Sequence, residues 1–335
     1  MFKEVVYLPG SQEIEINSFI NEYHSNSSEY TFFTSGSTGT PKKLIFSKDQ
    51  LAISAKKSIT YFELNETHTF YLCLDIKTVA ARMLIVRAYL CGARLVCGPV
   101  KKEFVLPKKE RIDFISLVPI QLQYLLQKNY EALRKSKILI GGTSISNQLV
   151  NDIVSLDLNC YQSFGMTETL SHVALRKITL PASPYEALTN ISFSVSDHRL
   201  IIHYPELQDV PIITNDEIVL IDNQHFHWKG RRDFVVNSGG IKLHPAAIED
   251  SIMENLGLKT LLFGIPDPVL GEKLFMLVQK ENLVDLNKSD FSFLLTHEIP
   301  KLYQCIDFFY FLPNEKMDRK KTQLAFKENE WRTLL

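Results

Sequence analysis

The sequence has few cysteines, almost no net charge and no long apolar run, and each shortage argues against a class of protein. The five cysteines are odd in number and form no Cys-x-x-Cys pair, which argues against a disulfide framework and a structural zinc site. They predict reduced thiols and a cytoplasmic location. A net charge of −1 suggests no nucleic-acid partner. No stretch reaches the roughly 18 apolar residues of a membrane span, and we expect no secretory signal.

The pattern of apolar runs predicts an α/β protein of two domains. The 335 residues suffice for one large domain and one small one. Strands alternating with helices over residues 30–164 predict a largely parallel sheet covered by helices. Beyond residue 184 shorter runs predict a small antiparallel β-subdomain, and an α+β region follows. We expect an N-terminal domain over residues 1–231 and a C-terminal domain over residues 232–335.

One stretch combines glycines, hydroxyl groups and a lysine between two β-prone runs. It reads Thr34-Ser-Gly-Ser-Thr-Gly-Thr-Pro-Lys42. Glycines let the backbone approach a ligand, N–H groups and hydroxyls can surround phosphate oxygens, and a lysine adds a mobile charge. The alternative is a surface turn rich in serine and glycine. We predict a nucleotide phosphate site formed by Thr34, Ser35, Gly36, Ser37, Thr38, Gly39 and Lys42.

Two further stretches are typical of a ligand-binding crevice. Gly141 and Gly142 end an expected strand and precede an expected helix. Phe164-Gly-Met-Thr-Glu168 follows another short strand. Its aromatic face can stack on adenine, its hydroxyl can donate to a phosphate, and its carboxylate can hold Mg²⁺. The alternative for the last two residues is a helix N-terminus with an acid in its first turn.

Together these motifs resemble the adenylate-forming enzymes, the acyl-CoA synthetase and ligase superfamily. The resemblance implies a large N-terminal α/β domain with a small β-subdomain, and a small mobile α+β C-terminal domain. It implies ATP bound by the phosphate stretch, by Gly141 and Gly142, and by Phe164 and Gly165. Lys42, Thr167 and Glu168 would be catalytic, with Glu168 the magnesium ligand. Further matches are Asp216 as a ribose-binding residue, Arg231 as a second ribose or phosphate contact, and Asp233 as the interdomain hinge.

Two lysines in the C-terminal domain match catalytic positions of that superfamily. Lys242, after Ser238-Gly-Gly, resembles the loop used for thioester formation. Lys316, in Lys316-Met-Asp-Arg319, resembles the segment that carries the adenylation lysine, although Glu315 stands where glycine is expected. The alternatives are an ordinary surface lysine for Lys242 and a solvated basic tail for Lys316. Asp216 has its own alternative, an Asn-Asp turn.

The order of the motifs is similar to that of the short o-succinylbenzoate–CoA ligases of menaquinone biosynthesis. This resemblance implies ATP, Mg²⁺ and coenzyme A, and a small carboxylic acid that is first adenylated and then passed to the thiol. Those ligases often read Ala-Gly-Lys-Met where this chain has Ala80-Ala-Arg82-Met83. Candidate contacts for the acid's second carboxyl or keto group are Arg82, Ser171, His172 and Arg176.

Each of these candidates has a structural alternative. Arg82, like Arg87 in the same apolar stretch, could extend its charge to the surface. His172 could be a hydrogen-bonded structural histidine. Two other functions stay open, a CoA ligase for another aryl or acyl acid and a nucleotide-binding homologue without catalysis. The oligomeric state is also open, with a homodimer as one possibility.

Overall fold

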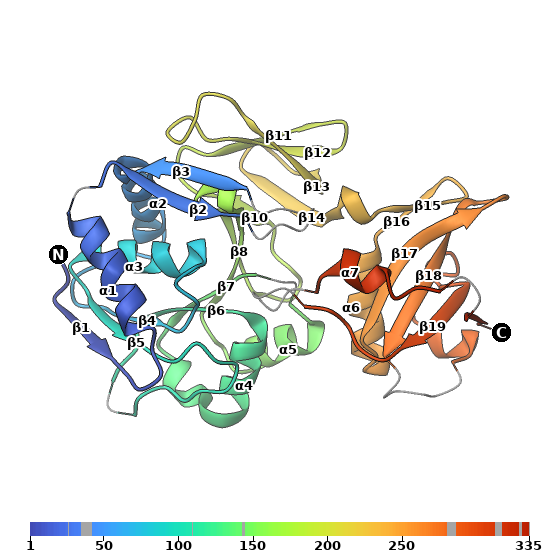
Figure 1. Cartoon of the computed structure of the whole chain (residues 1–335), viewed down its shortest axis with the longest axis horizontal. Helices are drawn as coiled ribbons and strands as arrows, with labels where there is room; N and C mark the ends of the chain where they lie inside the picture. Colours follow the sequence, from blue (N-terminus) through green and yellow to red (C-terminus); the bar gives the residue numbers. More distant parts are fainter. Residues whose placement is uncertain are drawn as a thin grey trace.

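A computed structural model describes residues 1–25, 27–34, 42–108, 110–142, 145–279, 286–311, 317–327 and 330–334. Within these residues, twelve strands form one large sheet (Figure 1). In sheet order they are β1 (Glu4–Tyr7), β5 (Arg94–Cys97), β4 (Thr69–Leu72), β6 (Phe114–Leu117), β7 (Lys137–Ile140), β8 (Cys160–Met166), β9 (Ser171–Lys177), β10 (Tyr185–Ala187), β14 (His225–Arg231), β13 (Ile212–Leu220), β12 (Arg199–His203) and β11 (Ser192–Ser196).

The sheet is parallel from β1 to β8 and antiparallel from β9 onward. The parallel half confirms the sequence prediction. The antiparallel strands expected beyond residue 184 are present and continue the same sheet, because β9 folds back on β8 and carries the hydrogen bonding from one half to the other. A separate pair, β2 (Glu29–Phe33) and β3 (Lys43–Ser47), flanks the predicted phosphate stretch.

Helices cover both faces of the parallel half. Successive residues of a strand point to opposite faces, and Phe70 and Leu72 of β4 accordingly join one apolar cluster while Tyr71 joins the other. On the first face lie α1 (Glu13–His24), α2 (Lys48–Tyr61) and α3 (Val79–Cys91), and on the second α4 (Pro119–Asn129) and α5 (Asn147–Ser155). This two-faced burial explains why the strands of the parallel half are almost entirely apolar.

Side-chain caps decide where several helices begin. The Ser47 hydroxyl accepts from Gln50 N at the start of α2, and Ser146 accepts from Leu149 N at the start of α5. The sequence predicts α3 from residue 75, but the helix begins at Val79 because Thr78 caps it by accepting from Ala81 N.

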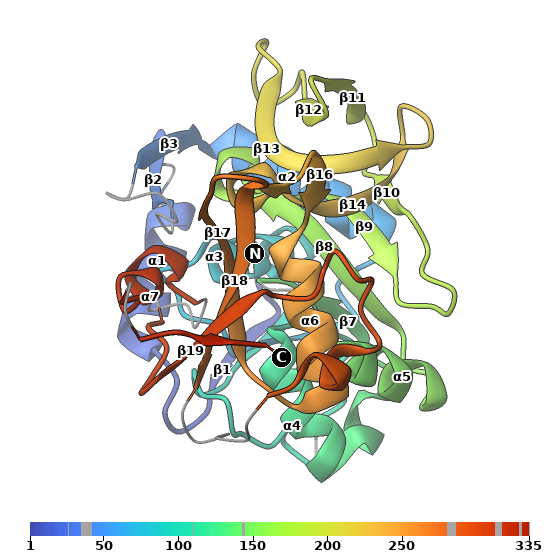
Figure 2. The same ribbon diagram turned by 90° about the vertical axis from the view of Figure 1, so that its right-hand side faces the viewer.

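The C-terminal region has its own sheet and apolar clusters. Its elements are β15 (Val236–Ser238), β16 (Ile241–Leu243), α6 (Pro245–Leu256), β17 (Thr260–Asp267), β18 (Gly271–Gln279), β19 (Leu302–Ile306), α7 (Arg319–Gln323) and β20 (Arg332–Thr333). The 3-10 helices among the described residues are η1 (Tyr130–Leu133), η2 (Thr167–Thr169), η3 (Arg232–Phe234) and η5 (Lys288–Phe291). In Figure 2 this region faces the viewer, with α6 beside its strands. The Glu254 carboxylate of α6 accepts from the backbone and side-chain amides of Asn147 on α5, which joins the two regions.

Candidate active site

The predicted phosphate stretch is closed at its base by two hydrogen bonds. Thr34 N donates to Lys42 O at 3.0 Å, and Lys42 N donates to Thr34 Oγ1 at 3.0 Å. The Lys42 side chain is exposed. Ser35, Gly36, Ser37, Thr38 and Gly39 lie outside the described residues, as does Lys316. Their roles stay predictions.

Gly141 and Gly142 lie where the carboxyl ends of β6, β7 and β8 meet. Gly141 N donates to Leu117 O at 3.1 Å, which ties the end of β7 to the end of β6. A Cβ at Gly141 would lie 2.7 Å from Ser163 Oγ, and Gly142 has a φ of +96°. The edge formed by these strand ends is where α/β sheets bind ligands. Glycine suits the positive φ of Gly142, whereas a Cβ at Gly141 would require the Ser163 side chain to move.

The stretch from Phe164 to Glu168 forms the end of β8 and the start of η2, which leads into β9. The Phe164 ring packs edge-on against Tyr185 and Phe226, with centroids 5.7 Å and 5.2 Å apart. A Cβ at Gly165 would lie 2.2 Å from Ser171 O, so only glycine fits. Thr167 and Glu168 are half-buried in η2.

The backbone directly after η2 is strained. Leu170 and Ser171 both have positive φ, at 54° and 114°. Thr169 Oγ1 holds this geometry by donating within this segment, with Ser171 O 2.6 Å away. Non-glycine residues in such conformations are concentrated at functional sites, so the strain supports a functional role for the segment.

A single carboxylate, Glu168, is the predicted magnesium ligand. No group of three or more metal-ligating side chains occurs in the described part of the chain. One carboxylate fits Mg²⁺ that is held mainly by substrate phosphates and water.

Among the helices of the described residues, none has the length and apolar character that a membrane span requires.

Asp216 and Arg231 lie directly opposite each other on β13 and β14. Asp216 is buried, and its carboxylate Oδ1 accepts from Trp228 Nε1 at 2.8 Å. Burial raises the Asp216 pKa, while the indole N–H and the nearby guanidinium act in the opposite direction. Arg231 Nη2 donates to Asp233 Oδ2 at 2.6 Å, but Arg231 Nε is buried without a partner among the described residues. The pair therefore presents a free donor beside a carboxylate.

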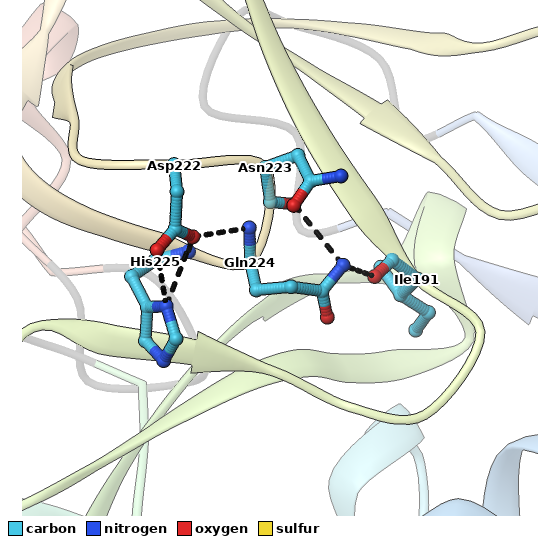
Figure 3. Close-up of polar contacts among 5 residues, drawn as sticks. All are labelled: Ile191, Asp222, Asn223, Gln224 and His225. Carbon is cyan, nitrogen blue, oxygen red and sulfur yellow. Dashed lines mark hydrogen bonds and ion pairs between the residues drawn. The ribbon is translucent and has the colours of Figure 1, made fainter.

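The turn that joins β13 to β14 is fixed by its own hydrogen bonds (Figure 3). Asp222 Oδ1 accepts from the backbone N of Gln224 and of His225, at 2.7 and 2.8 Å. Gln224 Nε2 donates to Ile191 O at 3.0 Å, which anchors the turn to the segment before β11. A cavity of about 470 Å³ lies nearby, lined by residues that include Asn190, His203 and Glu206. No predicted site residue lines it.

Arg82 is engaged with the protein itself. Its Nε donates to Ile76 O at 3.0 Å and its Nη1 to Thr31 O at 2.8 Å. The guanidinium also lies 5.2 Å from the ring centroids of both Phe19 and Phe32. These contacts tie α3 to α1 and β2. A substrate role for Arg82 stays a prediction. To bind a substrate, Arg82 would have to use Nε and Nη1, which already donate to Ile76 O and Thr31 O. Arg176 is likewise engaged, because its Nε donates to Gln162 Oε1 at 2.8 Å.

Arg87, one turn further along α3, is the arginine that the prediction of substrate contacts omits. Its side chain is 1% exposed, and no carboxylate pairs with it in the described structure. Its Nη2 donates to Ser171 Oγ at 3.0 Å, while its Nε has no partner among the described residues. Burial lowers the pKa of this guanidinium. The apolar residues around Arg87 are a signal in the sequence that favours its burial, but they do not distinguish it from Arg82.

Ser171 and His172 meet Arg87 in one buried polar cluster. Ser171 Oγ lies 3.3 Å from His172 Nδ1, and His172 Nε2 lies 2.9 Å from Ser58 Oγ on α2. Burial, together with the neighbouring positive charge of Arg87, holds the His172 pKa well below its usual range. The cluster thus joins α2, α3 and β9 around one uncompensated cation.

In the C-terminal region, Lys242 is exposed on β16. Arg319 instead forms a two-bond ion pair with Glu249, at 2.6 and 2.8 Å, and also donates to Leu262 O. Its guanidinium lies 4.7 Å from the Phe234 ring centroid. The alternative of a solvated basic tail would include Arg319, Lys320 and Lys321 beside Lys316, and for Arg319 it is wrong.

Comparison with known proteins places the chain in a family. The model of the AMP-binding enzyme family matches residues 11–220, which include both nucleotide motifs and Asp216. A 2-succinylbenzoate–CoA ligase of Staphylococcus aureus (strain Newman) is 24% identical over 329 residues, covering 86% of this chain. The chain spans 65% of the length of that relative.

Solved structures match the fold. One is an acyl-CoA synthetase (AMP-forming)/AMP-acid ligase II-like protein from Dyadobacter fermentans, 29% identical with a TM-score of 0.61, covering 93% of this chain and 94% of that one. Another is the o-succinylbenzoate coenzyme A synthetase of Bacillus subtilis in complex with ATP and magnesium ion. It is 18% identical with a TM-score of 0.78, over 89% of this chain and 70% of its own. These matches confirm the expected adenylate-forming fold, and the chain belongs to the AMP-binding enzyme family.

Proposed function

We propose that this protein is an AMP-forming carboxylate–CoA ligase that converts o-succinylbenzoate to o-succinylbenzoyl-CoA. The observation that carries the proposal is the buried charge of Arg87, which has no carboxylate partner among the described residues. Arg87 donates to Ser171, which follows Glu168 of the predicted nucleotide motif by three residues. A buried cation without an internal anion is costly unless a ligand supplies the anion. A dicarboxylic acid can do so with one carboxylate while the other reacts at ATP.

The chemistry follows in two steps. In the first, an oxygen of the reacting carboxylate bonds to the α-phosphorus of ATP, and the bond to pyrophosphate breaks. In the second, the sulfur of coenzyme A bonds to the acyl carbon, AMP leaves with the bonding electron pair, and the thiol proton passes to solvent. Mg²⁺, when bound at Glu168, would neutralise phosphate charge.

The residues of the chain serve mainly to offset charge in the first step, which brings two anions together. We assign Thr34, Ser35, Thr38 and Lys42 to the phosphates, Thr167 and Glu168 to the phosphates and metal, and Lys316 to the α-phosphate. Removing one such preorganised partner typically costs a hundredfold to a thousandfold in rate. Asp216 and Arg231 would bind the ribose, and Phe164 and Gly165 the adenine.

The second step would use the other face of a small C-terminal domain. We propose the boundary between residues 231 and 232, with Asp233 as the hinge and Lys242 brought to the thioester step after rotation. A hinge at the boundary of an element is the usual way to gate an active site. A cytoplasmic location and a homodimeric assembly stay predictions.

The test is pyrophosphate release from ATP and Mg²⁺ with o-succinylbenzoate, with and without coenzyme A. We expect acid-dependent release, a thioester only when the thiol is present, and loss of release in Lys316→Ala. Lys321→Ala, a lysine of α7 five residues away, is the matched control and should stay active. Release with other aryl acids alone would keep the ligase and change the substrate. ATP binding without release for any acid would favour the non-catalytic alternative.

A further inference from the structure

Trp228 reaches Asp216 only because the register between β13 and β14 shifts. Asp216 pairs with Arg231 and Glu217 with Gly230, but Ile218 pairs with Trp228, so Lys229 is an extra residue on β14. In an unbroken register Trp228 would lie on the opposite face from Arg231. The β-bulge at Lys229 instead brings Trp228 and Arg231 to the same face as Asp216.

The indole contributes a fixed, single hydrogen bond to a buried acid. Trp228 Nε1 can only donate, and it lies 2.8 Å from Asp216 Oδ1. Asp216 is 6% exposed, whereas Trp228 is 37% exposed. Rotation of a carboxylate about χ2 is soft when nothing holds it. The bond from Trp228 therefore engages Oδ1 and limits this rotation, with the Thr214 side chain as a second hydrogen-bonding neighbour of the carboxyl group.

We infer that Trp228 is the positioning residue that orients Asp216 toward the hydroxyl groups of the nucleotide ribose. The inference rests on the proposed function, in which Asp216 binds the ribose. With Oδ1 held by the indole, Oδ2 accepts from a ribose hydroxyl. The buried Arg231 Nε–H, which has no partner among the described residues, donates to the oxygen of the same diol. A hydroxyl group both donates and accepts, so it satisfies both protein groups at once.

The alternative role for Trp228 is to stabilise a buried carboxylate without effect on ligand choice. The two roles differ in one measurable property. A merely structural bond would change the binding of every nucleotide alike. A positioning bond would change the binding of nucleotides that have the hydroxyl and leave those that lack it.

The experiment measures dissociation constants of the full chain for ATP, 2′-deoxy-ATP and 3′-deoxy-ATP. The chain has two tryptophans, and Trp331, which stacks on Phe326 in the C-terminal region, provides the matched control. Trp331→Phe leaves Trp228 as the sole indole, so its fluorescence reports binding directly. Binding by Trp228→Phe is followed by isothermal calorimetry.

We expect the wild type and Trp331→Phe to prefer ATP over at least one deoxy analogue by about tenfold or more, the usual effect of losing a hydrogen bond to a charged group. In Trp228→Phe, ATP binding should weaken about tenfold while the deoxy analogues change little, so the preference disappears. Trp228→His, which keeps a ring N–H, should restore part of it, and this variant carries the test if Trp228→Phe does not fold.

Two results would overturn the inference, and they are distinct. Equal weakening of all three nucleotides in Trp228→Phe would leave Trp228 a structural residue while the proposed nucleotide site stands. Absence of ATP binding by the wild type would reject the proposed function itself, and the inference with it.

Discussion

Arg87 and Arg319 are both largely buried, yet within the described part of the chain only Arg319 has a counter-ion. Arg319 is held by two bonds to Glu249 and one to Leu262 O, and it joins α6, α7 and β17. Arg87 lies deeper, and among the described residues its guanidinium donates a hydrogen bond only to the Ser171 hydroxyl. In a buried ion pair the two charges neutralise each other within the fold. A buried cation without a counter-ion leaves a positive charge that an anionic ligand can neutralise. The comparison separates an arginine that holds the scaffold from one that is available to a substrate.

The largest expected effect comes from breaking the internal pair. Glu249→Ala would leave Arg319 without its anion and Leu262 N without its acceptor. We expect the free energy of unfolding to fall by about 3 kcal/mol, as when one partner of a buried pair is removed. Urea unfolding measures it. Glu330→Ala, which removes an exposed acid in the same region, is the control. A loss no larger than that of the control would refute the contrast.

The opposite result is expected for the lone cation. Arg87→Met should leave the free energy of unfolding unchanged or raise it, because an uncompensated charge is removed from an apolar site. Acid-dependent pyrophosphate release should fall about a hundredfold. Arg82→Met is the matched variant on the same helix. Were Arg82→Met to abolish the dependence on acid while Arg87→Met kept it, the two assignments would have to be exchanged.

Burial beside Arg87 should also make the stability of the protein depend on pH, through the neighbouring His172. The folded-state pKa of His172 is well below the unfolded value of about 6.5. The unfolded chain therefore binds more protons as pH falls, and stability is lost below about pH 6.5. Stability should therefore fall progressively as the pH is lowered from 7.5 to 5.5. Urea unfolding of His172→Gln should lack that part of the slope. The exposed His297→Gln should retain it.

The smallest effect is expected at a third arginine, which is paired but exposed. Arg232 Nη1 lies 2.6 Å from Asp197 Oδ2, and both side chains are about half exposed. Arg232→Gln should leave the unfolding midpoint unchanged, because solvent screens such pairs. A shift comparable to that of Glu249→Ala would mean that burial is not what distinguishes these arginines.

Local signals in the sequence predicted local structure well. The sequence predicts a helix over residues 147–155, and α5 has these bounds, because Ser146 caps an amphipathic segment. The two strands around the predicted phosphate stretch are also present. The sequence missed β9, since Ser171 and His172 interrupt its apolar run and only the pairing with β8 makes it a strand. The prediction of substrate contacts named Arg82 and not Arg87, because periodicity alone does not say which face of an apolar helix meets a ligand.

The pairing of β1 with β5 has a consequence for how the chain is made. β1 ends at Tyr7, and its partner begins almost ninety residues later at Arg94. At about 5–20 residues per second, the ribosome needs roughly 4 to 17 seconds to add that interval. During this time the first strand has no sheet to join, whereas β11 and β12 can pair as soon as they are synthesised. The β1 edge of the large sheet can therefore form only after β5 has been synthesised.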